Sequence, residues 1–217
     1  GNVKTVHLAD CHRFQAKSVI LAPGGKPRPL NIPGEELFKG TGVSYCATCD
    51  GEFFTGKEII VVGGGNSALE EAVALTNFVS KVTIVHQFNN FQAFEHAIQE
   101  AKKNPKISFI MGSELREIKG NKLIEAVMIE NLATGKLSEM KTDGVFIFIG
   151  YLPNTESLKD IVKTNDRNEI VTDADMKTNI PGVFAAGDCI AKKYRQVTTA
   201  VADGTIAALS AMEYLRS

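Results

Sequence analysis

The feature that most constrains the fold is a short apolar run that leads into three glycines and then into an amphipathic segment. Residues 58–62 read EIIVV, a run typical of a strand buried in a parallel sheet. The glycines at 63–65 follow at once, and residues 66–79 place apolar side chains on one face of a helix. With the apolar run at 81–85, this pattern predicts a strand–helix–strand unit.

The glycine cluster has the spacing Gly63-x-Gly65-x-x-Ala68. In such a turn the first glycine permits the tight bend, the second lets the backbone approach a pyrophosphate, and the small third residue lets helix and strand pack closely. Asn66 or Ser67 is placed to cap the helix, whose N-terminus favours phosphate groups. A purely structural turn is the alternative, but the strand–helix context favours a nucleotide site. Its residues would be Gly63, Gly64, Gly65, Asn66, Ser67 and Ala68.

The rest of the chain predicts further alternation of strands and helices. Residues 113–142 contain two turn signals between short strands, which indicates an antiparallel meander. The other expected elements are a strand ending in the turn at 24–25, a helix near 91–103, a buried strand in 143–150, two short strands in 169–189 and a closing helix over 198–215. The sequence therefore predicts an α/β fold with a three-layer, Rossmann-like nucleotide-binding domain.

Composition excludes several classes of protein. The chain is 44% hydrophobic and 23% charged, with a formal net charge of -1, so it offers no basic surface for nucleic acid. Its apolar runs are too short to span a bilayer, and residues 1–14 contain no apolar signal core. The four cysteines do not form a secreted disulfide framework. We expect a cytoplasmic protein that binds neither nucleic acid nor membrane.

Cys46 and Cys49 lie about a dozen residues before the glycines, in the segment CATCD. Cysteines three apart share one side of a helical turn, so their sulfur atoms can meet. A zinc site would need two further ligands, and neither Cys11 and Cys189 nor the four histidines show that spacing, so we expect no metal. A redox dithiol is favoured over zinc and over two inert buried cysteines. Asp50 follows directly; it is either a proton carrier for thiolate exchange or an ordinary turn residue.

The chain resembles the low-molecular-weight thioredoxin reductases over nearly its whole length. The resemblance rests on GVSYCATCDGEFFTGKEIIVVGGGNSALEEA and on three later motifs in the same order, VFIFIGYLPNT, TNIPGVFAAGDC and YRQVTTAVADGTIAA. It implies a homodimeric enzyme in which NADH or NADPH reduces FAD, FAD reduces the Cys-x-x-Cys disulfide, and the dithiol reduces thioredoxin or a similar protein. It also implies that one nucleotide domain carries both the dithiol and the nicotinamide site, and rotates against a flavin domain.

The resemblance also implies a role for individual residues. Cys49 corresponds to the sulfur nearer the flavin, Cys46 to the sulfur that exchanges with thioredoxin, and Asp50 to the general acid–base. Asp188, at the end of FAAGD, corresponds to the residue that binds the ribityl–phosphate region of FAD. The segment matched to the flavin ring consists of Arg195, Gln196 and Val197. Without the family, Asp188 would be a turn residue and Arg195 a solvated charge.

Cys11 and Cys189 match no catalytic position of the family, and we expect both to be small buried residues.

The chain departs from the family at the end of the second strand of the nucleotide domain. The family usually has His-Arg-Arg-x-x-x-Arg there, with arginines that hold the 2′-phosphate of NADPH, whereas this chain has Gln87, Phe88 and Gln92. Neutral side chains do not replace the charge of arginine. The acidic residue that typically holds a free ribose 2′-hydroxyl is also missing, and His86 takes that position unless it only packs at the strand end. We expect His86 and Gln87 near the ribose, and NADH to serve at least as well as NADPH.

The second departure is that no Gly-x-Gly-x-x-Gly fingerprint for FAD precedes residue 40. We expect residues 1–40 and 166–217 to be the middle and C-terminal parts of an FAD domain, and residues 41–165 to be the inserted nucleotide domain that carries the dithiol. The 217 residues by themselves are then expected to be a fragment or truncated form, inactive and unable to retain FAD. Two alternatives stay open: a nucleotide-binding fragment without turnover of its own, and a reductase with a donor such as ferredoxin, against which the glycine turn argues.

Overall fold

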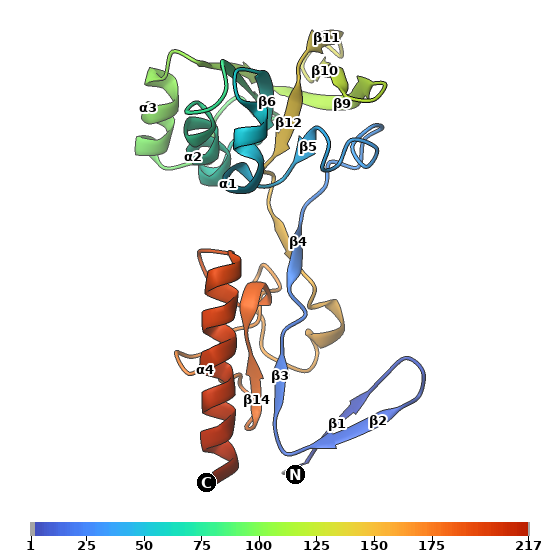
Figure 1. Cartoon of the computed structure of the whole chain (residues 1–217), viewed down its shortest axis with the longest axis vertical. Coiled ribbons are helices and arrows are strands. Elements are labelled where there is room, and N and C mark those ends of the chain that lie inside the picture. Colours follow the sequence, from blue (N-terminus) through green and yellow to red (C-terminus); the bar gives the residue numbers. More distant parts are fainter. Residues whose placement is uncertain (1–2, 217) are drawn as a thin grey trace. The chain divides into compact units, whose positions relative to one another are not determined.

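The structure is a computed structural model that describes residues 3–216. These residues form two compact units (Figure 1). The central unit comprises Pro27–Gly150, and the outer unit comprises the described residues before and after that range.

The unit boundaries differ from the predicted boundaries at 40/41 and 165/166. Residues 27–40 join the central unit because Phe38, which is 2% exposed, lies in its hydrophobic core. Residues 151–165 join the outer unit because Val162 belongs to the core cluster there. The packing of single apolar side chains therefore sets each unit boundary, and no local sequence pattern reveals that packing.

A parallel sheet forms the middle layer of the central unit. Its strand order is β5 (Val43–Ser44), β12 (Gly144–Ile147), β6 (Glu58–Val62), β7 (Lys81–His86) and β8 (Ile107–Met111). The predicted pairing of residues 58–62 with residues 81–85 is confirmed, in a parallel register that sets Val62 opposite Val85. Both faces of this sheet are covered, which explains the continuous apolar runs.

The two faces of the sheet belong to two hydrophobic clusters. In β6 the side chains of Ile59 and Val61 enter the cluster on the helical face, whereas Ile60 and Val62 enter the other cluster. Successive side chains of a strand point to opposite faces, so one apolar strand contributes to two core layers.

Helices cover one face of the sheet (Figure 1). They are α1 (Ala47–Asp50), which continues into the 3₁₀ turn η1 (Gly51–Phe54), α2 (Asn66–Leu75) and α3 (Glu95–Lys103). The prediction that Asn66 or Ser67 caps α2 is wrong, because Gly65 is the N-cap. The amide oxygen of Asn66 instead accepts the backbone N–H of Phe94, at 2.7 Å. That bond holds the loop before α3, which begins later than the predicted residue 91.

The predicted meander covers the other face. β9 (Ser113–Gly120), β10 (Ile124–Asn131) and β11 (Leu137–Lys141) are antiparallel, in the order β11-β10-β9. Leu115, Val127 and Ile129 pack from the meander into the cluster that contains Ile60 and Val62. The predicted three-layer α/β architecture is confirmed.

The outer unit contains short strands and the long helix α4 (Val197–Arg216). β3 (Val19–Leu21) pairs in parallel with β14 (Val183–Ala185), and β4 (Gly25–Pro27) pairs with β13 (Tyr151–Pro153). The 3₁₀ turns are η2 (Glu156–Leu158) and η3 (Gly187–Cys189). Buried alanines of α4, Ala207 and Ala211, pack on Phe184 of β14.

Two local features of the outer unit differ from the prediction. β1 (Lys4–His7) and β2 (Arg13–Ala16) form an antiparallel hairpin that the sequence did not predict. Of the two short strands expected in 169–189, only β14 forms, since Ile170 makes isolated bridges to Thr164 and Ile190 and not a ladder. Between Val3 and Arg216, no helix combines the length and apolar character needed to cross a bilayer.

Candidate active site

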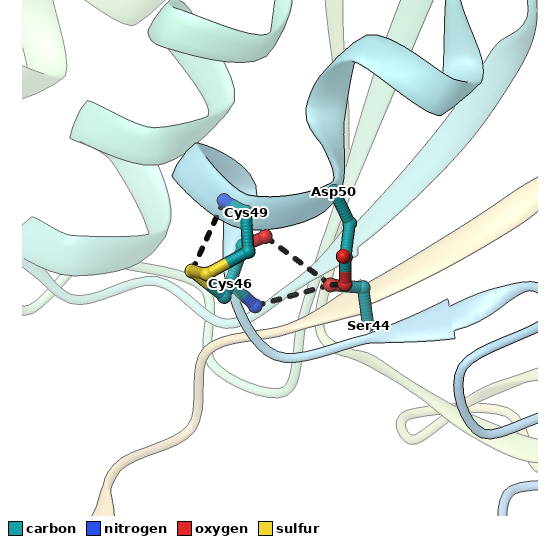
Figure 2. The surroundings of a disulfide bond; sticks show 4 residues. All are labelled: Ser44, Cys46, Cys49 and Asp50. Carbon is teal, nitrogen blue, oxygen red and sulfur yellow. Dashed lines mark hydrogen bonds between the residues drawn. A yellow bond between two sulfur atoms is a disulfide. The ribbon is translucent and has the colours of Figure 1, made fainter. Parts of the chain in front are cut away.

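Cys46 and Cys49 form a disulfide at the start of α1 (Figure 2). Their Cα atoms are 5.3 Å apart. Cys46 is the N-cap residue of α1, and its Sγ accepts the backbone N–H of Cys49 at 3.2 Å. The predicted meeting of the two sulfur atoms on one helical turn is confirmed. Cys49 is exposed and Cys46 is half-buried, so a partner can reach the bond.

Asp50, the last residue of α1, is held by a hydroxyl group that the sequence analysis did not single out. The Oγ of Ser44 donates to Oδ2 of Asp50 at 2.6 Å (Figure 2). The Oγ of Ser44 also accepts the backbone N–H of Cys46, at 3.1 Å. Ser44 is 4% exposed. The signal available in the sequence was a hydroxyl residue two positions before a reactive cysteine.

A pocket borders Asp50 and Ser44. Thr41, Phe53 and Lys57 contribute to its wall. The Phe53 side chain is 76% exposed, and Lys57 Nζ lies 5.4 Å from the ring centroid of Phe54. Asp50 therefore lies where solvent and a partner protein have access to its carboxylate.

The glycine turn has the shape that the motif predicts. Gly63 has φ +137°, and a Cβ atom there would lie 2.4 Å from the carbonyl oxygen of Phe148. A Cβ on Gly64 would lie 2.5 Å from the ring of His86. Ala68 is fully buried beneath the turn. In the first turn of α2, Asn66 is half-buried and Ser67 is exposed. This turn presents its free N–H groups beside the glycine backbone, which carries no side chains, and such an arrangement suits a pyrophosphate.

The loop after β7 lies against this turn. The backbone N–H of Gln92 donates to the carbonyl of Gly64 at 2.9 Å. Gln87, Phe88 and Gln92 are all exposed there. The structure therefore brings the positions of the missing arginines next to the glycine turn.

His86 packs under the turn and is 4% exposed. Its Nε2 lies 3.2 Å from the carbonyl oxygen of Asn90, and its ring stacks on Phe91 with the centroids 5.8 Å apart. Burial lowers the pKa of His86, and the bond to Asn90 opposes that effect. The neutral imidazole of His86 therefore supports the loop after β7, and little of its ring is exposed to solvent.

In the outer unit, Asp188 lies in η3 just after β14. Its Oδ1 is buried, and within residues 3–216 it makes no hydrogen bond. Lys192 Nζ is 3.5 Å from this oxygen, at ion-pair distance, and the Tyr151 hydroxyl is 3.5 Å from Oδ2. Small residues line a pocket beside Asp188, among them Gly24, Ala186, Ala200 and Gly204. Oδ1 of Asp188 is thus a buried carboxylate oxygen that makes no hydrogen bond, and it borders a pocket lined by small residues. Such a site fits a ligand that carries hydroxyl groups, such as the ribityl chain of FAD.

Arg195 is anchored and is not a solvated charge. Its guanidinium pairs with Glu169, donates through Nε to the carbonyl of Asp188 at 3.3 Å, and lies 4.8 Å from the ring centroid of Tyr151. Burial, followed by the charge of Asp188, raises the pKa of Tyr151 to about 12. Gln196 and Val197 are exposed at the start of α4. Arg195 and Asp188 therefore meet at one end of the outer unit.

The sequence did not predict a half-buried ion pair next to Asp188. Lys192 Nζ lies 2.7 Å from Oδ2 of Asp203, which also accepts the backbone N–H of Gly187 at 3.2 Å. The available signal was an aspartate within the otherwise small and apolar run TTAVADGTIAAL.

The two remaining cysteines differ from each other. Cys189 is buried as expected, its Sγ lies 3.3 Å from the carbonyl of Ala186, and burial raises the pKa of its thiol. The prediction that Cys11 is buried is wrong, because Cys11 is exposed at φ +68° in the loop between β1 and β2.

Comparison with known proteins gives a consistent result. The model of the family described as pyridine nucleotide-disulphide oxidoreductase matches residues 1–204. The thioredoxin reductase of Peptoclostridium acidaminophilum is 45% identical, over 100% of this chain and 70% of the relative. That of Bacillus subtilis is 44% identical, over 99% of this chain and 68% of the relative. The crystal structure of thioredoxin reductase from Streptococcus pyogenes has a TM-score of 0.89 and 45% identity, and covers 100% of this chain and 71% of that one.

Proposed function

Because the chain belongs to the pyridine nucleotide-disulphide oxidoreductase family, we propose that it passes electrons from a nicotinamide nucleotide through FAD to the Cys46–Cys49 disulfide, and from there to thioredoxin or a thioredoxin-like protein. The observation that carries the proposal is the exposed disulfide on the same unit as a glycine turn shaped for a pyrophosphate. The thioredoxin reductases among its relatives support the choice of thioredoxin. By the same resemblance the enzyme is a cytoplasmic homodimer.

FAD suits the pocket beside Asp188, whose Oδ1 can accept a ribityl hydroxyl, while Arg195, Gln196 and Val197 address the ring. When bound, FAD supplies a two-electron carrier between nicotinamide and disulfide. The chain's own contribution is to hold Asp188 and Arg195 in place. The Lys192–Asp203 and Glu169–Arg195 pairs do this, since both are largely shielded from solvent.

The nicotinamide nucleotide suits the glycine turn and the loop after β7. Gly63, Gly64 and Gly65 let the backbone approach the pyrophosphate, and the first turn of α2, from Asn66 to Ala68, directs free N–H groups at it. His86 shapes the loop from below, and Gln87 is the exposed polar side chain that can meet the ribose. We propose that NADH serves at least as well as NADPH, because the exposed residues of this loop carry no positive charge for a 2′-phosphate.

The dithiol performs the second half of the reaction. In the roles that the resemblance suggests, Cys49 faces the flavin, Cys46 attacks the disulfide of thioredoxin, and Asp50 supplies and removes the proton. The thiolate is the attacking form, so a carboxyl group one residue from Cys49 is well placed for this work.

The test is a coupled assay in which the full-length, FAD-loaded protein reduces thioredoxin with NADH or NADPH. Cys46→Ser and Cys49→Ser should each abolish thioredoxin reduction, because a single thiol cannot form or reopen the disulfide. Cys11→Ser and Cys189→Ser should leave the rate nearly unchanged, since neither cysteine takes part in the disulfide. Full activity of the Cys49→Ser variant would contradict the proposed function.

A further inference from the structure

We infer that Ser44 is a positioning residue for Asp50, and that it decides which carboxylate oxygen of Asp50 carries the exchanging proton. The inference rests on the proposed function, in which the Cys46–Cys49 pair undergoes thiol–disulfide exchange. Ser44 has no role in the resemblance and contacts the reacting sulfur atoms only through its neighbours.

The hydroxyl of Ser44 has three polar neighbours but only one proton. Oδ2 of Asp50 lies 2.6 Å from Oγ, and the carbonyl oxygen of Cys46 lies 3.3 Å away. The shorter, charge-assisted bond to the carboxylate wins the proton. The oxygen of Ser44 remains free to accept the backbone N–H of Cys46. Figure 2 shows the carboxylate of Asp50 pointing at this hydroxyl.

Ser44 can hold Asp50 because it belongs to the sheet and not to the short helix α1. It lies in β5 opposite Phe146 of β12, and it is buried. α1 spans only Ala47–Asp50, too short to fix its last side chain by itself. The hydroxyl therefore links the sheet, the proton carrier and the backbone of Cys46.

A chemical consequence follows from this arrangement. Because Oδ2 of Asp50 already accepts the hydrogen bond from Ser44, the exchanging proton resides on Oδ1 of Asp50. Opening of the disulfide by two electrons from the nicotinamide donor yields two thiolates. Transfer of the Oδ1 proton to one sulfur leaves one thiol, one thiolate and an ionised Asp50, whose Oδ2 still accepts from Ser44.

The exchange step passes that proton to the partner. The thiolate attacks a sulfur of the partner disulfide, an S–S bond to the partner forms, and the partner's other sulfur leaves as a thiolate. Asp50 takes the proton of the remaining thiol on Oδ1 and gives it to the departing thiolate. The new thiolate then closes the Cys46–Cys49 bond and releases the second partner sulfur, which takes its proton from water. Asp50 is left ionised, and its Oδ1 takes up a second proton from water before the next reduction.

A dithiol assay without flavin or nicotinamide tests this role. The protein is reduced with dithiothreitol, freed of it, and mixed with oxidised glutathione or with an aromatic disulfide, dithiobis(nitrobenzoate). The leaving thiolate of glutathione is basic and needs a proton, whereas the aromatic thiolate leaves without one. Ser44→Ala should slow the reaction with oxidised glutathione by about tenfold to a hundredfold, which is part of the roughly 10²–10⁴-fold that a general acid contributes. The aromatic disulfide should react at nearly the wild-type rate.

Further variants separate positioning from a structural effect. Ser44→Thr keeps the hydroxyl and should restore the glutathione rate, and Ser44→Gly provides a second hydroxyl-free variant. In the Asp50→Asn background, Ser44→Ala should cost nothing more, because residues that act through one another are not additive. Thr55→Ala, which removes an exposed hydroxyl beyond Asp50, is the matched control and should change neither rate.

Three results would overturn the role of Ser44: equal slowing with both disulfides, additive losses with Asp50→Asn, or a wild-type rate of Ser44→Ala with oxidised glutathione. Failure of the FAD-loaded protein to oxidise NADH or NADPH would refute the proposed function instead, and the dithiol assay would still report on Ser44.

Discussion

At the scale of single residues, the surface beside the glycine turn is defined by three uncharged side chains. Gln87, Phe88 and Gln92 are exposed there, and Phe88 is 49% exposed. Its ring lies edge-on to His86, with the centroids 5.4 Å apart, so the loop offers an aromatic edge and two amides. A 2′-phosphate would find no bidentate partner among these three residues.

We predict that NADPH has no advantage over NADH as a donor. A hydrogen bond to a charged group contributes about 1.5–3 kcal/mol, so two lost contacts to the 2′-phosphate remove about 3–6 kcal/mol, or about 10²–10⁴ in affinity. Steady-state kcat/KM with each donor measures this. The double variant Phe88→Arg, Gln92→Arg keeps Gln87, and it should raise kcat/KM for NADPH and leave that for NADH nearly unchanged. A wild-type preference for NADPH of a hundredfold would contradict the prediction.

His86 predicts how stability depends on pH. Burial lowers its pKa in the folded protein below the ordinary value of 6.5, so the unfolded chain takes up a proton first as the pH falls. The contribution of His86 to stability is therefore complete above pH 6.5 and is lost as the pH falls from there toward its folded pKa. The His86→Phe variant should lose less stability than wild type between pH 7.5 and 5.5, as measured by urea unfolding.

The exposed His96 of α3 provides the control for that measurement. His96→Gln should keep the wild-type dependence on pH, because the side chain of His96 is exposed and its loss leaves the buried His86 in place. Equal losses in the wild type and in His86→Phe would show that other groups cause the acid instability.

At the scale of elements, the segment that leads to the disulfide is fixed by one buried carboxylate. Glu35 is 4% exposed, and it accepts the backbone N–H groups of Leu30 and Asn31 at 2.9 and 2.6 Å. It also accepts the hydroxyl of Tyr45 at 2.7 Å, next to Cys46. Burial and then the neighbouring Glu35 raise the pKa of Tyr45, so this hydroxyl remains a donor at physiological pH. Glu35 thus ties the chain before β5 to the residue that precedes the active cysteine.

We predict that Glu35→Ala destabilises the protein by about 3 kcal/mol, because it leaves several partly buried donors without their partner. Tyr45→Phe should cost about 1 kcal/mol, the contribution of one hydrogen bond. Urea unfolding gives both values. Glu36→Ala is the matched control: Glu36 is exposed and only pairs with exposed Lys39, so its loss should change stability by less than about 0.5 kcal/mol. Equal effects of Glu35→Ala and Glu36→Ala would contradict this account.

At the scale of the whole molecule, the central unit is one continuous segment, Pro27–Gly150, with the sheet between two hydrophobic clusters. The described chain segments before and after it form the outer unit, which has cores of its own. The disulfide, Ser44 and Asp50 all lie within the central unit, so its chemistry depends on its own packing.

We therefore predict that residues 27–150 fold by themselves and keep the dithiol chemistry. The isolated segment should unfold in urea with one cooperative transition and should react, once reduced, with oxidised glutathione at nearly the rate of the whole chain. A gradual transition, or loss of the exchange reaction in a folded segment, would show that the outer unit is required.

The sequence by itself determined the parts of this protein that depend on near neighbours. The apolar run at 58–62, the glycines after it and the amphipathic helix predicted the parallel unit that the structure contains. Turn signals predicted the meander, and a spacing of three predicted that Cys46 and Cys49 could meet. Each of these features follows from backbone geometry over a few residues, which a periodic pattern records.

Only the tertiary structure decided which side chains share a hydrogen bond. Insertion of β12 between β5 and β6 places Ser44 at its buried position, from which it holds Asp50. The pairing of Arg195 with Glu169 likewise joins residues from separate turns. Such contacts depend on strand order and register, which place distant residues within 3 Å of each other, and no local pattern encodes that distance.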